Sequence, residues 1–124
     1  MNLNCIIIDD EPLARKGLKE YIADVDFLDL IGEFENSLKA TELIARGEVQ
    51  LLFLDIQMPK INGFEMLELI DNPPHVIFTT AFEEYAIKAF ETHAVDYLLK
   101  PFSKERFDKA LQKFFHFILE LEFF

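Results

Sequence analysis

Four apolar runs in this sequence end at polar side chains that could do chemistry together. These side chains are Asp9 and Asp10, Asp55, Thr80 and Lys100. Carboxylates held close together raise one another's pKa unless a cation lies between them. Their hard oxygens suit Mg²⁺, which keeps several waters and takes one or two protein carboxylates. Phosphoryl transfer mainly requires positioning and charge neutralisation, so with Mg²⁺ and Lys100 beside it Asp55 could act as a nucleophile that accepts a phosphoryl group.

Each of these residues alone has a simpler interpretation. A single Asp after a strand is more often a helix cap or a turn former, and a Lys-Pro pair is often only a turn. Taken together, an acidic pair, an Asp, a Thr and a Lys at the same end of successive strands favour a shared site.

The elements that must position these residues alternate along the chain. Apolar runs predict strands, and residues at helical spacing predict amphipathic helices. The predicted strands span residues 3–8, 28–34, 51–54, 75–79 and 94–99, and the predicted helices begin near Pro12, Ser37, Gly63, Glu83 and Ser103. Five such units predict an α/β fold, a doubly wound five-stranded parallel sheet with five helices on its two faces. Ligands bind such sheets at the carboxyl ends of the strands, near the point where the winding reverses.

Length and charge exclude several classes of protein. A chain of 124 residues is the size of one domain. Its formal net charge of −11 would repel a phosphate backbone, so we expect no nucleic-acid binding by this domain. Cys5 is the single cysteine and lies in an apolar run, which fits a reducing, cytoplasmic setting. The first apolar run is too short for a signal peptide or a membrane span.

Four stretches of the chain carry a family resemblance. IIIDDEP, FLDIQMPKINGFE, IFTTAFEEYAIKAF and AVDYLLKPF follow one another as in the receiver domains of two-component response regulators. The resemblance covers about residues 3–114 and implies the flavodoxin-like receiver fold. DDEPLAR, TTAFEEYAIKAFE and AVDYLLKPF are similar to receivers that precede LytTR-type (LytR/AlgR-like) DNA-binding domains.

The resemblance implies a role for each residue of the candidate site. Asp55 would be the phospho-acceptor, and Asp10 would bind Mg²⁺ directly. Asp9 would interact with the metal indirectly, through a bound water or through another ligand. The backbone carbonyl of Gln57 would be another ligand. Lys100 would pair with the phosphoryl group.

Four further positions match the family. Thr80 would hydrogen-bond the phosphoryl group, and Tyr97 would be the aromatic side chain that changes rotamer when Thr80 moves. Gly63 would lie in a tight turn beneath the phosphorylation loop. The bond before Pro101 would be cis, since an X-Pro bond is where the cis isomer costs little. For Tyr97 and Gly63 the simpler alternatives are a packed strand tyrosine and a flexible turn glycine.

The resemblance also implies a function in two-component signalling. A sensor histidine kinase would donate the phosphoryl group, because the chain has no GxxxxGK[ST] or GxGxxG nucleotide-binding motif. The domain would catalyse only its own phosphorylation and dephosphorylation, so we do not expect an enzyme with a separate substrate. Its fourth and fifth βα units would shift on phosphorylation and mediate homodimerisation. The domain would regulate an output, transcription through a LytTR-type DNA-binding domain outside this chain.

The C-terminal end is unusually rich in phenylalanine. We expect a receiver domain over residues 1–116 and an apolar tail over residues 117–124, with the output domain absent. The tail could pack on a partner chain, begin a linker or include non-native residues. These alternatives stay open.

Two other functions are compatible with an aspartate at this position. An aspartate-based, Mg²⁺-dependent phosphatase would need a second catalytic Asp shortly after the nucleophile, where this chain has Gln57. A pseudo-receiver would bind partners without phosphorylation, and such proteins usually lose the acidic pair, the acceptor or the lysine. All of these are present here.

Overall fold

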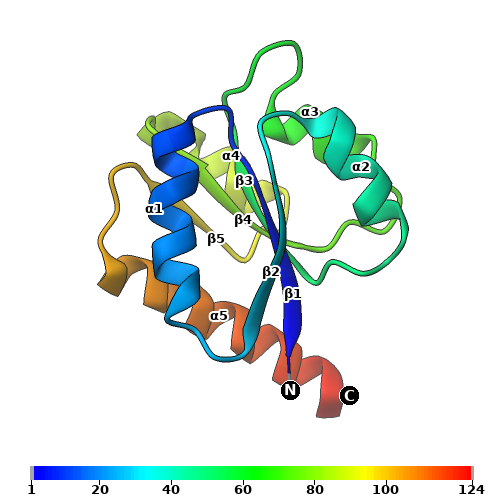
Figure 1. The fold of residues 1–124 in the computed structure, drawn as a ribbon, viewed down its shortest axis with the longest axis vertical. Helices are drawn as coiled ribbons and strands as arrows, with labels where there is room; N and C mark the ends of the chain where they lie inside the picture. Colours follow the sequence, from blue (N-terminus) through cyan, green and yellow to red (C-terminus); the bar gives the residue numbers. More distant parts are fainter. Residues whose placement is uncertain (1, 124) are drawn as a thin grey trace.

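Five parallel strands form one twisted sheet in the computed structural model, which describes residues 2–123, with side chains for residues 2–120 (Figure 1). The strands are β1 (Leu3–Ile8), β2 (Leu28–Phe34), β3 (Leu51–Asp55), β4 (His75–Thr80) and β5 (Asp96–Leu99). Their order is β2-β1-β3-β4-β5, and every neighbouring pair is parallel. The predicted parallel sheet is confirmed.

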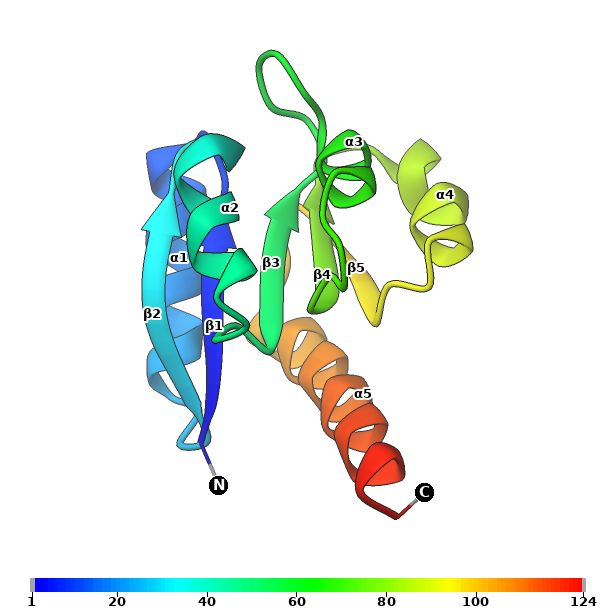
Figure 2. The same cartoon turned by 90° about the vertical axis from the view of Figure 1, so that its right-hand side faces the viewer.

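Helices cover both faces of this sheet, so the predicted three-layer arrangement is confirmed as well (Figure 2). They are α1 (Pro12–Ala23), α2 (Ser37–Ala45), α3 (Gly63–Glu68), α4 (Ala86–Glu91) and α5 (Lys104–Phe123), with a short 3₁₀ turn, η1 (Glu83–Tyr85), before α4. Residues of α1 and α5 bury one face of the sheet, and residues of α2, α3 and α4 bury the other.

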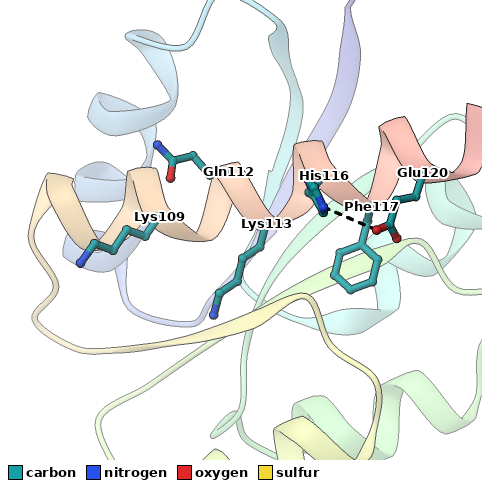
Figure 3. A pocket seen from close by; sticks show the side chains of 6 residues that line it. All are labelled: Lys109, Gln112, Lys113, His116, Phe117 and Glu120. Atoms are coloured by element: carbon teal, nitrogen blue, oxygen red, sulfur yellow. Dashed lines mark ion pairs between the residues drawn. The ribbon is translucent and has the colours of Figure 1, made fainter.

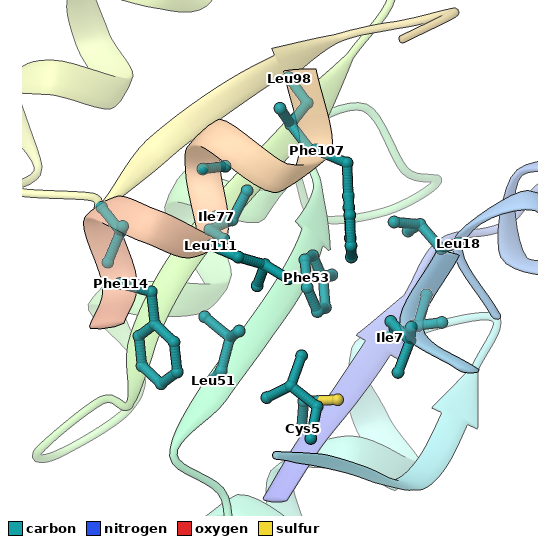
Figure 4. Packing of buried hydrophobic residues seen from close by; sticks show 14 of the residues in the cluster. Cys5, Ile7, Leu18, Leu51, Phe53, Ile77, Leu98, Phe107, Leu111 and Phe114 are labelled. Carbon is teal, nitrogen blue, oxygen red and sulfur yellow. The ribbon is translucent and has the colours of Figure 1, made fainter. Parts of the chain in front are cut away.

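The core under α1 and α5 is dominated by large side chains from the middle of the sheet (Figure 4). Phe53 of β3 stacks on Phe107 of α5 at a ring-centroid distance of 5.7 Å, and Phe114 is fully buried about two helical turns further on. Every residue of β3 is buried, since helices cover both of its faces. This burial fixes β3, and with it Asp55, at the centre of the sheet.

The fourth unit differs from the single helix that the sequence predicts from about Glu83. The chain first makes the 3₁₀ turn η1 and only then the α-helix α4, and no side chain caps either of them. Ala89 is buried in the core, but Phe90 is 85% exposed and Ile87 is 74% exposed. Residues at helical spacing show which face is apolar, but they do not show whether another element covers it.

The third helix is shorter than its apolar spacing suggested. Gly63, Met66, Leu67 and Ile70 have helical spacing, but α3 ends at Glu68 and Ile70 lies beyond it. The amides of Leu69 and Ile70 bond to carbonyls three residues back, and Asn72 then adopts a φ of 53° before two prolines. The helix ends here because this turn reverses the chain.

The last helix extends well past the sheet (Figure 2). The Ser103 hydroxyl accepts a hydrogen bond from the Arg106 amide at 3.1 Å, as expected of a capping residue. Phe115 packs edge-on against Phe27 at 4.6 Å, whereas Phe117 is 44% exposed. The prediction of an apolar tail over residues 117–124 falls partly outside the described side chains. No helix within residues 2–123 is both long and apolar enough to cross a membrane.

Candidate functional site

The winding of the sheet reverses between β1 and β3, and acidic side chains meet at the carboxyl ends of these two strands. Asp9 and Asp10 follow β1, and Asp55 ends β3. One carboxylate oxygen from each of Asp9, Asp10, Glu11 and Asp55 lies within 4.8 Å of the others. The three aspartates predicted to form the site are thus brought together where such folds bind ligands.

Lys100 reaches into this group from the end of β5. Its Nζ lies 2.8 Å from Asp9 Oδ2, 3.0 Å from Glu11 Oε1 and 3.5 Å from Asp55 Oδ1. Asp9 is fully buried, and its Oδ1 accepts a hydrogen bond from the Glu11 amide at 2.9 Å. Within the described chain, the other oxygen of Asp9 meets only the Lys100 ammonium. The lysine is therefore held by charge on three sides.

The electrostatics of the site leave the negative charge incompletely balanced. Burial, with repulsion from Asp9 and Asp10, raises the pKa of Asp55 to about 7 even though Lys100 opposes the shift. Burial disfavours the charged form of Lys100, but its carboxylate partners outweigh burial and raise its pKa above the ordinary value. A further cation would relieve the repulsion, and carboxylate oxygens are the ligands that Mg²⁺ prefers. The residues present therefore fit a hard divalent cation.

Thr80 ends β4 next to this group, and it is almost fully buried. Its Oγ1 accepts a hydrogen bond from the Phe82 amide at 3.1 Å, so the hydroxyl is engaged with the turn that follows the strand. Lys100 is tied to the same strand end, because its amide donates to the Thr80 carbonyl at 2.7 Å. The two predicted phosphoryl-contacting residues thus sit on neighbouring strand ends.

Gly63 lies directly beneath the acceptor residue. Its amide donates to the Ile56 carbonyl at 2.8 Å, and a Cβ built on it would lie 2.8 Å from the Asp55 carbonyl oxygen. Its φ is not in the left-handed region, so the glycine is required by close approach rather than by flexibility. On the other side of the site, the Lys100–Pro101 peptide bond is cis.

Tyr97 and Gln57 are the remaining residues that the sequence predicts for the site. Tyr97 is half-buried, packs against the core under α2 to α4, and pairs in register with Phe78. The Gln57 side chain is exposed and points to another partner, since its Nε2 donates to the Tyr85 hydroxyl at 3.0 Å. The role of the Gln57 backbone carbonyl as a metal ligand stays a prediction.

Two features of the site region were missed by sequence reasoning. Glu11 joins the acidic group and pairs with Lys100, and its position next to the Asp9–Asp10 pair was the available signal. Asp96, buried at the start of β5, receives a bidentate hydrogen bond from Arg106 at 2.7 and 2.8 Å. Burial opposes ionisation of Asp96, but these bonds outweigh it and lower its pKa. Asp96 and Arg106 are ten residues apart and lie on different elements, so no local sequence pattern predicts that they pair.

A shallow groove along the outer side of α5 is separate from the acidic group (Figure 3). It is lined by Lys109, Gln112, Lys113, His116, Phe117 and Glu120. Within it, His116 Nε2 lies 3.5 Å from Glu120 Oε1, one helical turn along an exposed face. Both side chains are solvated, so this is a surface feature and not a second chemical site.

The sheet is doubly wound and parallel, and buried carboxylates and a lysine meet at its switch point. These features define the class of α/β signalling domains with an acidic, cation-binding pocket. The chain belongs to the response regulator receiver domain family, whose model matches residues 5–112. It is thus a receiver domain of two-component systems, and receiver domains bind Mg²⁺ at an acidic pocket of this kind.

The most similar proteins include transcriptional regulators. The chain is 45% identical over 113 residues to the transcriptional regulatory protein BtsR of Salmonella typhimurium, covering 90% of this chain and 47% of that protein. It is 43% identical over the same length to BtsR of Escherichia coli, again covering 90% and 47%. The chain therefore spans about half the length of the curated relatives it matches.

Solved structures agree with the fold. The response regulatory domain of protein mrkE from Klebsiella pneumoniae matches with a TM-score of 0.81 at 32% identity, covering 92% of this chain and 96% of that one. The REC domain of AraT, a response regulator from Geobacillus stearothermophilus, matches with a TM-score of 0.80 at 28% identity, covering 98% and 99%.

Proposed function

We propose that this receiver domain is a Mg²⁺-dependent phospho-acceptor switch and that Asp55 is the residue that is phosphorylated. The observation that carries the proposal is the position of Asp55. It ends the central strand, its carboxylate lies within 4.8 Å of those of Asp9 and Asp10, and the Lys100 ammonium is 3.5 Å away. The donor is the phosphohistidine of a sensor histidine kinase.

The proposed chemistry is a direct transfer between donor and acceptor. A carboxylate oxygen of Asp55 attacks the phosphorus atom, the P–N bond to the donor histidine breaks, and an acyl phosphate forms on Asp55. Lys100 balances the charge on the transferred group, because its ammonium already lies beside Asp55. Water later hydrolyses the acyl phosphate and returns Asp55 to its free form.

The proposed metal site uses the residues around Asp55. Asp10, Asp55 and the backbone carbonyl of Gln57 would hold Mg²⁺, with Asp9 acting through water. When bound, the ion supplies positive charge that neutralises the carboxylates and orients the phosphoryl oxygens. The buried, raised-pKa carboxyl of Asp55 supports this assignment, since its ionised form lacks sufficient compensation from Lys100 alone.

The proposed switch runs through Thr80 and Tyr97. A phosphoryl group on Asp55 would draw the Thr80 hydroxyl and Lys100 inward and so shift the population of arrangements of the fourth and fifth βα units. Tyr97 would change rotamer as Thr80 moves. Tyr97 pairs with Phe78 and packs in the core under α2 to α4, and strand alternation places Thr80 on the same face as Phe78. Tyr97 is therefore a switch residue and not a catalytic one.

We further propose that phosphorylation promotes homodimerisation through the fourth and fifth βα units. Ile87 and Phe90 of α4 are 74% and 85% exposed, which is apolar surface that an isologous partner would cover. The full-length protein would regulate transcription through a LytTR-type output domain, in the cytoplasm. In that scheme the receiver domain is residues 1–116, and residues 117–124 are an apolar tail or the start of a linker.

The test is intact-protein mass after incubation with Mg²⁺ and a small-molecule phosphodonor. One added phosphoryl group is expected on the wild-type chain, and none on Asp55→Asn or in the presence of a chelator. Asp26→Asn is the matched control, because Asp26 is an exposed aspartate outside the acidic group, and it should behave as wild type. Phosphorylation of Asp55→Asn to the wild-type level would reject the assignment.

A further inference from the structure

A hydrogen bond joins the loop after Asp55 to the turn that leads into α4. Gln57 lies two residues beyond Asp55, and its Nε2 donates to the Tyr85 hydroxyl at 3.0 Å. Tyr85 is the last residue of η1, and the bond links residues 28 positions apart in sequence. The end of η1 is therefore tied to the phosphorylation loop by a single pair of side chains.

The start of η1 is tied to the same site through Thr80. Phe82 precedes η1, and its amide donates to Thr80 Oγ1 at 3.1 Å. The rings of Phe82 and Tyr85 are perpendicular at a centroid distance of 6.3 Å. The turn is thus held at one end by the residue proposed to contact the phosphoryl group and at the other end by Gln57. A movement of Thr80 must therefore displace the start of η1 relative to its end, which Gln57 holds.

The ring of Tyr85 has its own packing, independent of its hydroxyl. It lies 6.1 Å from the Phe64 ring, which in turn packs on buried Phe78 at 4.8 Å. Lys88 of α4 places its ammonium over the same Phe64 ring at 4.9 Å. Phenylalanine at position 85 would keep these contacts and remove only the oxygen that Gln57 binds.

We propose that Tyr85 is a positioning residue whose hydrogen bond to Gln57 holds η1 and α4 in the arrangement seen here and opposes their shift on phosphorylation. This inference rests on the proposed function, in which a phosphoryl group on Asp55 draws Thr80 inward. A hydrogen bond made in only one of two arrangements lowers the apparent affinity of a ligand that selects the other arrangement. The factor is set by the free energy of that hydrogen bond.

The experiment measures the affinity for beryllofluoride with Mg²⁺, a mimic of the acyl phosphate, by titration of the backbone amides of residues 81–91 with NMR. Tyr85→Phe should bind about two- to tenfold more tightly than wild type, the range of one neutral hydrogen bond. In a Gln57→Ala background the same substitution should have no effect, because its partner is gone. Tyr21→Phe is the matched control. It also removes one tyrosine hydroxyl bond, to the Phe102 carbonyl at 3.2 Å on the opposite face, and should bind as wild type.

The outcomes separate the inference from the proposed function. Unchanged or weaker binding by Tyr85→Phe would overturn the inference, and so would an equal effect in the presence and absence of the Gln57 side chain. A wild-type chain whose amides do not respond to beryllofluoride would overturn the proposed function, and the inference with it. Tighter binding by Tyr85→Phe that disappears in Gln57→Ala supports both.

Discussion

Replacing Gly63 by alanine should destabilise the fold by pushing α3 away from the acceptor strand. The new Cβ would lie 2.8 Å from the Asp55 carbonyl oxygen, 3.1 Å from Leu54 Cγ and 3.3 Å from Ile56 Cα. Two of these atoms are backbone atoms of a fully buried segment and have no free rotamer to adopt. The start of α3 must move instead, which stretches the 2.8 Å bond from the Gly63 amide to the Ile56 carbonyl.

The size of this effect follows from the cost of overpacking. Inserting a methyl group into a closely packed site costs about 1–3 kcal/mol. Gly17 provides a matched control, because it lies within α1 and a Cβ there would meet nothing within 4 Å. Alanine is a better helix former than glycine, so Gly17→Ala should stabilise the domain by up to about 1 kcal/mol. The same chemical change therefore has opposite expected signs at the two positions.

Urea unfolding of the two variants and the wild type measures both effects. At roughly 4 °C per kcal/mol for a domain of this size, thermal midpoints should separate clearly as well. We also expect Gly63→Ala to be phosphorylated more slowly than wild type, since the displaced start of α3 lies against the backbone of Asp55. If Gly63→Ala is as stable as the wild type, the close-approach argument is wrong.

Three further predictions concern the elements around the site. Asn62→Ala should lose about 1 kcal/mol in urea unfolding, because the Asn62 side chain and Glu65 form a capping box at the start of α3. Phe107→Ala should lose about 3–5 kcal/mol from the buried core, whereas Phe117→Ala at the exposed groove should change the unfolding free energy far less; equal losses would contradict the packing described. Because the folded-state pKa of Asp96 is lowered, its contribution to stability is present above the unfolded pKa of about 3.9 and lost as the pH falls through the folded value. Asp96→Asn should therefore flatten the loss of stability below about pH 4 in urea midpoints, and an unchanged pH profile would argue against the ion pair.

Much of the fold could be predicted because short apolar runs indicate buried strands. Residues 51–54 are apolar without interruption, and β3 is buried on both faces as such a run implies. The gathering of Asp9, Asp10, Asp55 and Lys100 followed from the same reasoning, since the carboxyl ends of parallel strands lie at one edge. These predictions depended on sheet topology and not on any individual contact.

The features that were missed depend on tertiary contacts. The exposure of Phe90 depends on which elements cover α4, and a periodic pattern has no information on that point. The Asp96–Arg106 pair and the Gln57–Tyr85 bond join side chains from different elements. The participation of Glu11 depends on the rotamer that brings its carboxylate to Lys100.

Locating the phosphoryl group on the chain tests the central claim most directly. The wild-type chain would be phosphorylated with a small-molecule donor and Mg²⁺, reduced with borohydride to convert the aspartyl phosphate into a stable homoserine, and mapped by peptide mass spectrometry. The account predicts that the modified residue is Asp55, the last residue of β3. Modification at Asp9, Asp10 or Glu11 instead would contradict it.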